Sequence, residues 1–125
     1  MCWANNIAIP IVLKKPLRVY KVGISTISGV FISLYHNFMY FKHEVMPTVE
    51  VNPKFYRVHI SRFVYDIFHI YEGYHSYLTE EMAKCRRDEY DEIGIFEIPV
   101  GATIYVDYQY KEVVSTDIKY LGLLE

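Results

Sequence analysis

Short segments in which apolar and polar residues alternate recur along this chain, and this pattern most restricts its fold. Alternation with a period of two places successive side chains on opposite faces of a β-strand. It is clear in residues 17–22, 56–61, 103–108 and 114–120. Thirteen of the 125 residues are tyrosine, and aromatic side chains favour strands. We therefore predict a β-rich fold.

Residues 17–35 contain the clearest predicted hairpin, since two strand-like segments flank a turn rich in Ser, Thr and Gly. A further strand is predicted over residues 93–98, and one continuous last strand over 114–120. Residues 63–71 are ambiguous, because a short apolar run fits either a buried strand or one face of a helix. We favour a short helix there.

The main helix is predicted over residues 79–90. Thr79 can cap its N-terminus, and Glu80 and Glu81 suit the positive end of the helix dipole. Leu78, Met82 and Cys85 fall on one apolar face, so we expect Cys85 to be buried. The expected fold is α+β, with a twisted, mainly antiparallel sheet of five to seven strands packed on this helix in a single domain, residues 1–125.

The two cysteines, Cys2 and Cys85, form no CxxC pair, so both are expected to be reduced, as in an intracellular protein. No apolar run approaches the roughly 20 residues that a membrane-spanning helix needs. We therefore expect a cytoplasmic protein without a membrane partner.

The net charge of −2 conceals an asymmetry between the two halves of the chain. Residues 1–62 hold eight Lys and Arg against two acids, a balance of +6, and residues 63–125 hold five against thirteen, a balance of −8. Either the halves pack with complementary fields, or one side meets an anionic ligand or a second copy of the chain, most simply as a homodimer. The isoelectric point of about 6.2 argues against general DNA binding.

Two groups of residues are candidates for ligand or partner binding. The first group follows Gly73 in the sequence and consists of Tyr74, His75 and Tyr77, with Ser76 between the last two. His75 and Ser76 are expected to line the main concave site. The second is basic, and in it arginines could clamp a phosphate while nearby tyrosines stack on a base. We expect at most two or three of its members to meet. These basic candidates are Arg18, Lys21, Arg57 and Arg62.

No catalytic residue, metal site or cofactor is predicted. The five histidines form no close pair with Cys or His of the kind that zinc sites use. Cys85 on an apolar helix face is more typical of inert packing than of a nucleophile. Cys2 would be N-terminal if Met1 were removed, but the glycine-rich continuation of amidotransferases is missing.

Several segments occur in an order that resembles small uncharacterised proteins of bacteriophages and of mobile elements of gut bacteria. The resemblance implies a phage or mobile-element origin, and the leading hypothesis is a phage accessory protein without enzymatic activity. Such a protein would bind and block a host component of antiviral defence, either by occluding a host defence protein or by trapping a nucleotide-sized anionic signal. The segments are Met1-Cys2, Arg18–Val22, Glu72–Tyr77, Ile98–Tyr105 and Val113–Ile118.

The layout of the chain also resembles ADP-ribosyltransferase-like folds. By this resemblance Lys21 stands where those enzymes keep an arginine or histidine, and His75 and Ser76 stand for their serine-threonine-serine run. Glu97 or Glu112 would replace the catalytic glutamate. The alternative function implied is an enzyme that modifies a host target.

Overall fold

The computed structural model describes residues 2–4, 9–25, 29–34 and 38–125. Strands dominate these ranges, and the one helix in them is α1, Glu80–Arg86. The strands form a nine-stranded and a three-stranded sheet in which every strand pair is antiparallel. The expected α+β class is confirmed, although five to seven strands was too low a number.

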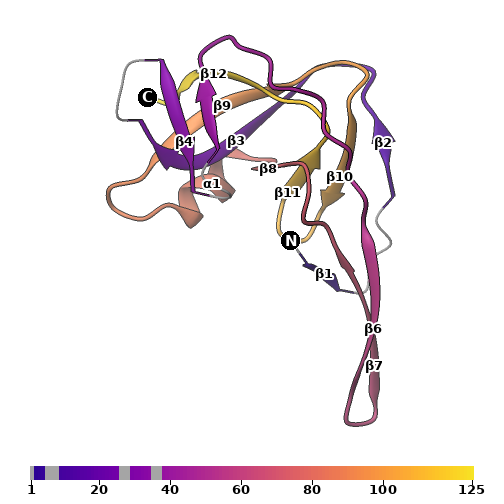
Figure 1. Ribbon diagram of the computed structural model, residues 1–125. Helices are drawn as coiled ribbons and strands as arrows, with labels where there is room; N and C mark the ends of the chain where they lie inside the picture. The colour runs from indigo at the N-terminus through magenta and orange to yellow at the C-terminus, as the bar shows by residue number, and fades with distance from the viewer. Residues whose placement is uncertain (1, 5–8, 26–28, 35–37) are drawn as a thin grey trace.

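The nine-stranded sheet forms the body of the molecule, and α1 lies against it (Figure 1). Its strand order is β12-β9-β3-β8-β11-β10-β2, and β4 and β5 extend from β3. The bounds of these strands are β2 Ile11–Val12, β3 Leu17–Ile24, β4 Val30–Ser33, β5 Met39–Phe41, β8 Tyr74–Tyr77, β9 Glu92–Ile98, β10 Thr103–Asp107, β11 Glu112–Ser115 and β12 Lys119–Leu123.

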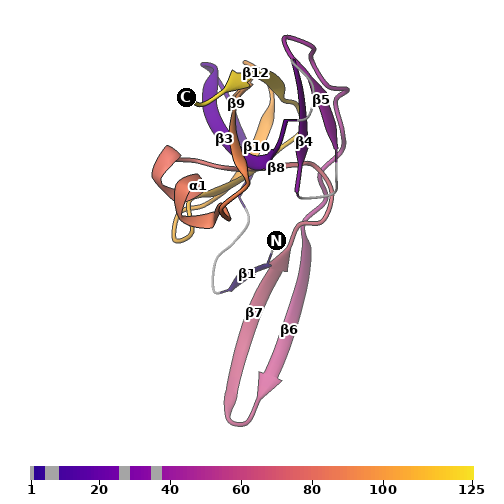
Figure 2. The ribbon, with the colours of Figure 1, turned by 90° about the vertical axis from the view of Figure 1, so that its left-hand side faces the viewer.

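A long hairpin, residues 54–69, projects away from the body, and we call it the arm (Figures 1 and 2). It consists of β6, Lys54–Ile60, and β7, Phe63–His69, and β1, Cys2–Ala4, pairs with β7. The short helix expected over residues 63–71 is therefore wrong. Ser61, with a φ of 57°, makes a tight turn, and every residue of β7 then pairs with β6. Pairing with β6 thus decides between strand and helix, which the apolar pattern of these residues leaves open.

An aromatic cluster forms the centre of the main core. Phe31, Tyr40, Phe96 and Tyr120 are all buried and come from β4, β5, β9 and β12. The ring centroids of Tyr40 and Phe96 lie 5.0 Å apart in an edge-to-face arrangement, which is a favourable geometry for aromatic pairs. Only part of the aromatic content fills this core, because other aromatic side chains, such as Tyr90 and Tyr108, are exposed.

Helix α1 begins where the sequence predicts, because the Thr79 hydroxyl accepts a hydrogen bond from the Met82 main-chain nitrogen at 3.2 Å. It ends at Arg86, several residues earlier than expected. Its buried residue is Ala83, whereas Cys85 is exposed, contrary to the prediction. The small Ala83 side chain sits against Val22 and Ile93 of the sheet, so this side of the helix, and not that of Cys85, faces inward.

The continuous strand expected over residues 114–120 is also wrong, because residues 116–118 between β11 and β12 are not part of a strand. Thr116 donates its hydroxyl to Asp117 at 2.6 Å in the intervening segment. The main-chain oxygens of Thr116 and Ile118 accept bonds from residues 46–49 instead of from a strand. β11 therefore pairs with β8 and β10, and β12 pairs with β9.

No helix in the ranges given above has the length and apolar character required to cross a membrane.

Candidate functional site

Strand β3 changes its neighbour along one edge, and the change opens a gap in the sheet. Tyr20 pairs with Tyr77 of β8, whereas Gly23 and Ile24 pair with β4. Lys21 lies between these two pairings. β8 and β4 therefore separate beside Lys21, and we call this place the fork.

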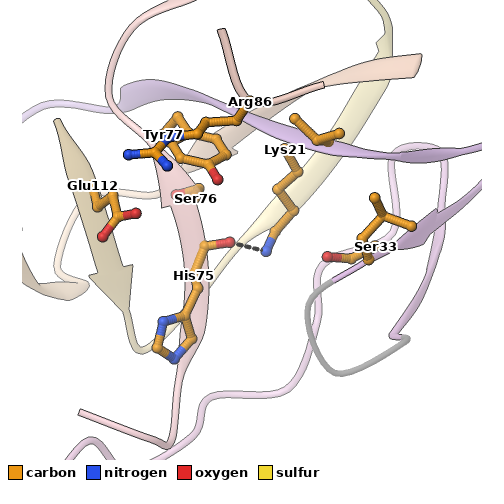
Figure 3. Close-up of a pocket in the computed structure, with 9 residues that line it drawn as sticks. Lys21, Ser33, His75, Ser76, Tyr77, Arg86 and Glu112 are labelled. Atoms are coloured by element: carbon orange, nitrogen blue, oxygen red, sulfur yellow. Dashed lines mark hydrogen bonds between the residues drawn. The ribbon is translucent and has the colours of Figure 1, made fainter. Parts of the chain in front are cut away.

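A cavity of about 280 Å³ occupies the fork (Figure 3). Ligand pockets usually measure roughly 300–1,000 Å³, so this one suits a small molecule or one part of a larger molecule. Strands β3, β4, β8 and β11 and the last turn of α1 contribute its walls. The lining residues are Lys21, Val22, Ser33, Leu34, His75, Ser76, Tyr77, Arg86 and Glu112.

Lys21 is the most unusual residue of the cavity. Only 2% of its surface is exposed, and its ammonium nitrogen donates a hydrogen bond to the main-chain oxygen of His75. Burial lowers the pKa of Lys21 from 10.5 to about 7. The rings of Tyr40 and Phe96, with centroids 5.3 and 5.7 Å from the nitrogen, favour the charged form. Desolvation outweighs them, so close to neutral pH a large share of Lys21 is an uncharged amine.

The alternation of β3 explains why a lysine points inward. Val19, Lys21 and Gly23 share one face of the strand, and all three are buried. Gly23 leaves no room for a side chain, since an added Cβ would lie 2.1 Å from the main-chain oxygen of Ile32. This close approach brings β4 against β3 next to Lys21 and fixes one branch of the fork.

Arg86 and Glu112 form a part of the cavity wall that lies on the other side of β8 from the Lys21 amine (Figure 3). Burial raises the pKa of Glu112, Asp107 raises it further, and Arg86 opposes the shift. The pKa of Tyr77 is also raised, first by burial and then by the Glu112 carboxylate. This wall therefore offers an arginine, a carboxyl group that keeps its proton to higher pH than usual, and a phenol.

Ser76 adds a hydroxyl that the surrounding side chains do not satisfy. Within the described ranges its oxygen is buried and has no hydrogen-bond partner. Buried hydroxyls are normally paired, since leaving one unpaired costs roughly 1–3 kcal/mol. Because Ser76 lines the cavity, a bound polar ligand could supply the missing partner.

The structure brings three of the predicted site residues, Lys21, His75 and Tyr77, to this cavity. His75 is buried, and its ring nitrogen lies 3.0 Å from the main-chain oxygen of Tyr71. Tyr74 lies elsewhere. Its ring packs in the main core, and its hydroxyl donates a hydrogen bond to the Pro47 oxygen at 2.5 Å.

The four basic candidates do not converge. Arg18 is exposed on β3, in register with Glu97 of β9, and Arg57 and Arg62 belong to the arm or its turn. Only Lys21 reaches the cavity. The predicted phosphate clamp of several converging basic residues is therefore not formed, because the arm carries two of them away from the body (Figure 2).

Arg86 is the functional candidate that the sequence did not reveal. In the sequence it belongs to a mixed-charge helix face that is typical of solvated residues. Its place in the cavity depends on where α1 ends relative to β8 and β11, and no local pattern encodes that relationship. Glu112 was one of the two glutamates considered, and Glu97 does not line the cavity.

Among the side chains in the described ranges, no three of His, Cys, Asp or Glu come together as potential metal ligands. Comparisons of the chain with protein-family models, with curated proteins and with solved structures gave no match.

Proposed function

We propose that this is a phage accessory protein without enzymatic activity that sequesters a small anionic molecule of the host, such as a nucleotide signal of an antiviral defence. The protein would act in the host cytoplasm. The observation that carries the proposal is the cavity in the fork, where Lys21 and Arg86 line one small space. The phage origin rests on the sequence resemblance described above.

The chemistry of the walls suits an anion. A bound phosphate or carboxylate would favour the charged form of Lys21, and the Arg86 guanidinium can form paired hydrogen bonds with it. Ser76 can donate a further hydrogen bond, and Val22 and Leu34 supply apolar surface. The volume of about 280 Å³ restricts the buried part of the ligand to about the size of a mononucleotide or a sugar phosphate.

Calorimetry with linear and cyclic nucleotides and with sugar phosphates tests this proposal. For a ligand that binds, Arg86→Gln should weaken affinity roughly tenfold to a hundredfold, the usual effect of losing a charged hydrogen bond. Arg87→Gln is the matched control, because Arg87 is exposed like Arg86 but does not line the cavity. No heat with any of these compounds would contradict sequestration and favour occlusion of a host protein.

One observation favours a second function, an ADP-ribosyltransferase-like enzyme. Lys21, His75 and Glu112, which stand for that family's site residues by resemblance, line the same cavity. Transfer of label from radioactive NAD to host-lysate proteins would support this activity. Glu112→Gln should then abolish the transfer, whereas Glu97→Gln should leave it intact. NAD binding without transfer or hydrolysis would favour sequestration.

We also propose that the protein forms a homodimer through the arm. Isolated two-stranded hairpins are marginally stable in water, and the arm exposes apolar side chains on both faces. Tyr56 and Ile60 lie on one face, 49% and 59% exposed, and Val64 lies on the other, 54% exposed. The arm with its turn also carries the basic residues Lys54, Arg57 and Arg62. They suit the four acidic residues of a second copy, Asp88, Glu89, Asp91 and Glu92.

A further inference from the structure

The Lys21 nitrogen has three features that ordinary surface lysines lack. It is removed from solvent, it borders a cavity large enough for a small molecule, and a hydrogen bond to the main-chain oxygen of His75 holds it in place. A desolvated amine whose pKa burial lowers to about 7 is in part uncharged at neutral pH, and that part has its lone pair available for attack on carbon. Electrostatic binding of anions does not require this property.

We propose that the Lys21 amine condenses with the carbonyl group of a small aldehyde or ketone that also carries a carboxylate or phosphate, and holds it in the cavity as an imine. This inference rests on the proposed small-ligand site and names the ligand class that the site would take. It adds a covalent bond to what would otherwise be reversible ionic binding.

The condensation requires no oxidant, reductant or further reactant. The nitrogen lone pair attacks the carbonyl carbon, the carbonyl π electrons move to oxygen, and one proton passes from nitrogen to that oxygen. The resulting hydroxyl group takes up a second proton and leaves as water, while the nitrogen lone pair forms the C=N bond. Loss of the last proton from nitrogen gives the neutral imine, so amine and carbonyl yield imine and water.

Other residues that line the cavity supply the further groups that this reaction needs. The Arg86 guanidinium can hold the carboxylate or phosphate of the ligand. Glu112 keeps its proton to higher pH than an exposed carboxyl group, because burial and Asp107 raise its pKa, and it can protonate the departing hydroxyl. Ser76, whose oxygen is buried without a partner in the described structure, can bind the carbonyl oxygen before attack.

Reductive trapping tests the proposal on the wild-type protein. The chain is incubated with pyruvate or with glyceraldehyde 3-phosphate and sodium cyanoborohydride at neutral pH, and the modified lysines are located by peptide mass spectrometry. The exposed residues Lys14, Lys54 and Lys84 serve as internal controls. We expect Lys21 to carry at least about tenfold more label than any of them. The proposal would be overturned if all lysines carried equal amounts of label, or if Lys21 carried the smallest amount.

Two comparisons identify the ligand's charge and separate this proposal from ionic binding. Arg86→Gln should reduce trapping of pyruvate but not of uncharged propionaldehyde, whereas Arg87→Gln should change neither. Calorimetry with lactate and glycerol 3-phosphate, which lack the carbonyl group, reports the ionic site alone. If these two compounds bind and Lys21 is not trapped, the anion site stands and the imine is refuted. If Lys21 is trapped and the nucleotides give no heat, the imine stands and nucleotide sequestration fails.

Discussion

The Lys21 side chain donates a hydrogen bond to the main-chain oxygen of His75, across the fork where β3 and β8 stop pairing (Figure 3). The two strands share one residue pair, Tyr20 with Tyr77, before they separate. A side chain therefore links the strands where main-chain pairing has ended. The same amine that joins β3 to β8 also belongs to a residue that lines the cavity, so the stability of the fold and the properties of the site depend on one group.

This arrangement predicts how stability changes with pH. The pKa of Lys21 is about 7 in the folded chain and 10.5 as its ordinary value, so between these values the unfolded state binds more protons. The free energy of unfolding should then rise with pH across this window because of Lys21, by at most about 1.4 kcal/mol per pH unit. Lys21→Met should remove this contribution.

Urea denaturation of the wild type and of Lys21→Met between pH 6.5 and 9.5 measures the effect. Lys84→Met is the control, because Lys84 is exposed and pairs with Glu80 on the helix surface, at 2.9 Å. The difference between wild type and Lys21→Met should grow in favour of the wild type as pH rises, and the control should run parallel to the wild type. Parallel curves for Lys21→Met would show that the amine has an ordinary pKa.

The parts of the fold that could be predicted are those that local sequence determines. Alternation identified the strands around residues 56–61 and 103–108, and the Thr79 hydroxyl marks the start of α1 as expected. The short helix favoured for residues 63–71 was wrong, since the seven-pair register with β6 decides the conformation of residues 63–69.

The candidate site shows the same limit more strongly. His75 and Tyr77 could be selected because polar and aromatic groups fall together at a glycine. Lys21 was selected for its charge, but its burial follows from the inward face of β3 and the close approach of β4. Arg86 reaches the cavity only because α1 ends beside it. Long-range packing creates the chemistry of this cavity, and single segments do not encode it.

Gly73, which precedes β8, should be intolerant of substitution. Its φ is +93°, and an added Cβ would lie 2.7 Å from Val114 and 2.8 Å from Val51. Gly101 is a matched control with a φ of +89° and no atom within 4 Å of an added Cβ. Gly101→Ala should therefore show backbone strain alone, about 1–3 kcal/mol. Gly73→Ala should lose about a further 1–3 kcal/mol through overpacking. Equal losses in thermal or urea unfolding would refute the packing argument.

Thr79 should contribute to the stability of α1 through its hydroxyl. Thr79→Ala removes the acceptor for the Met82 main-chain nitrogen and should lower the free energy of unfolding by about 1 kcal/mol. Thr79→Ser keeps an acceptor at the same position and should stay within about 0.5 kcal/mol of the wild type. If urea unfolding shows the same loss for both variants, the effect does not come from the cap.

The arm should determine the mass of the protein in solution. If it mediates a homodimer, light scattering at tens of micromolar should give twice the 14.8 kDa of one chain. The double variant Ile60→Ser, Val64→Ser removes one exposed apolar side chain from each face of the arm and should shift the mass to that of the monomer. Its free energy of unfolding, measured at low concentration, should change little, because both side chains are more than half exposed. Val100→Ser is the control, since Val100 is 57% exposed in the turn after β9, outside the arm, and should leave the dimer intact. High salt should also weaken the dimer if Arg57 and Arg62 meet acidic residues of the second copy.

A wild-type mass of 14.8 kDa at tens of micromolar protein, without added salt, would refute the dimer. An unchanged dimer in the double variant would exclude the arm as its interface.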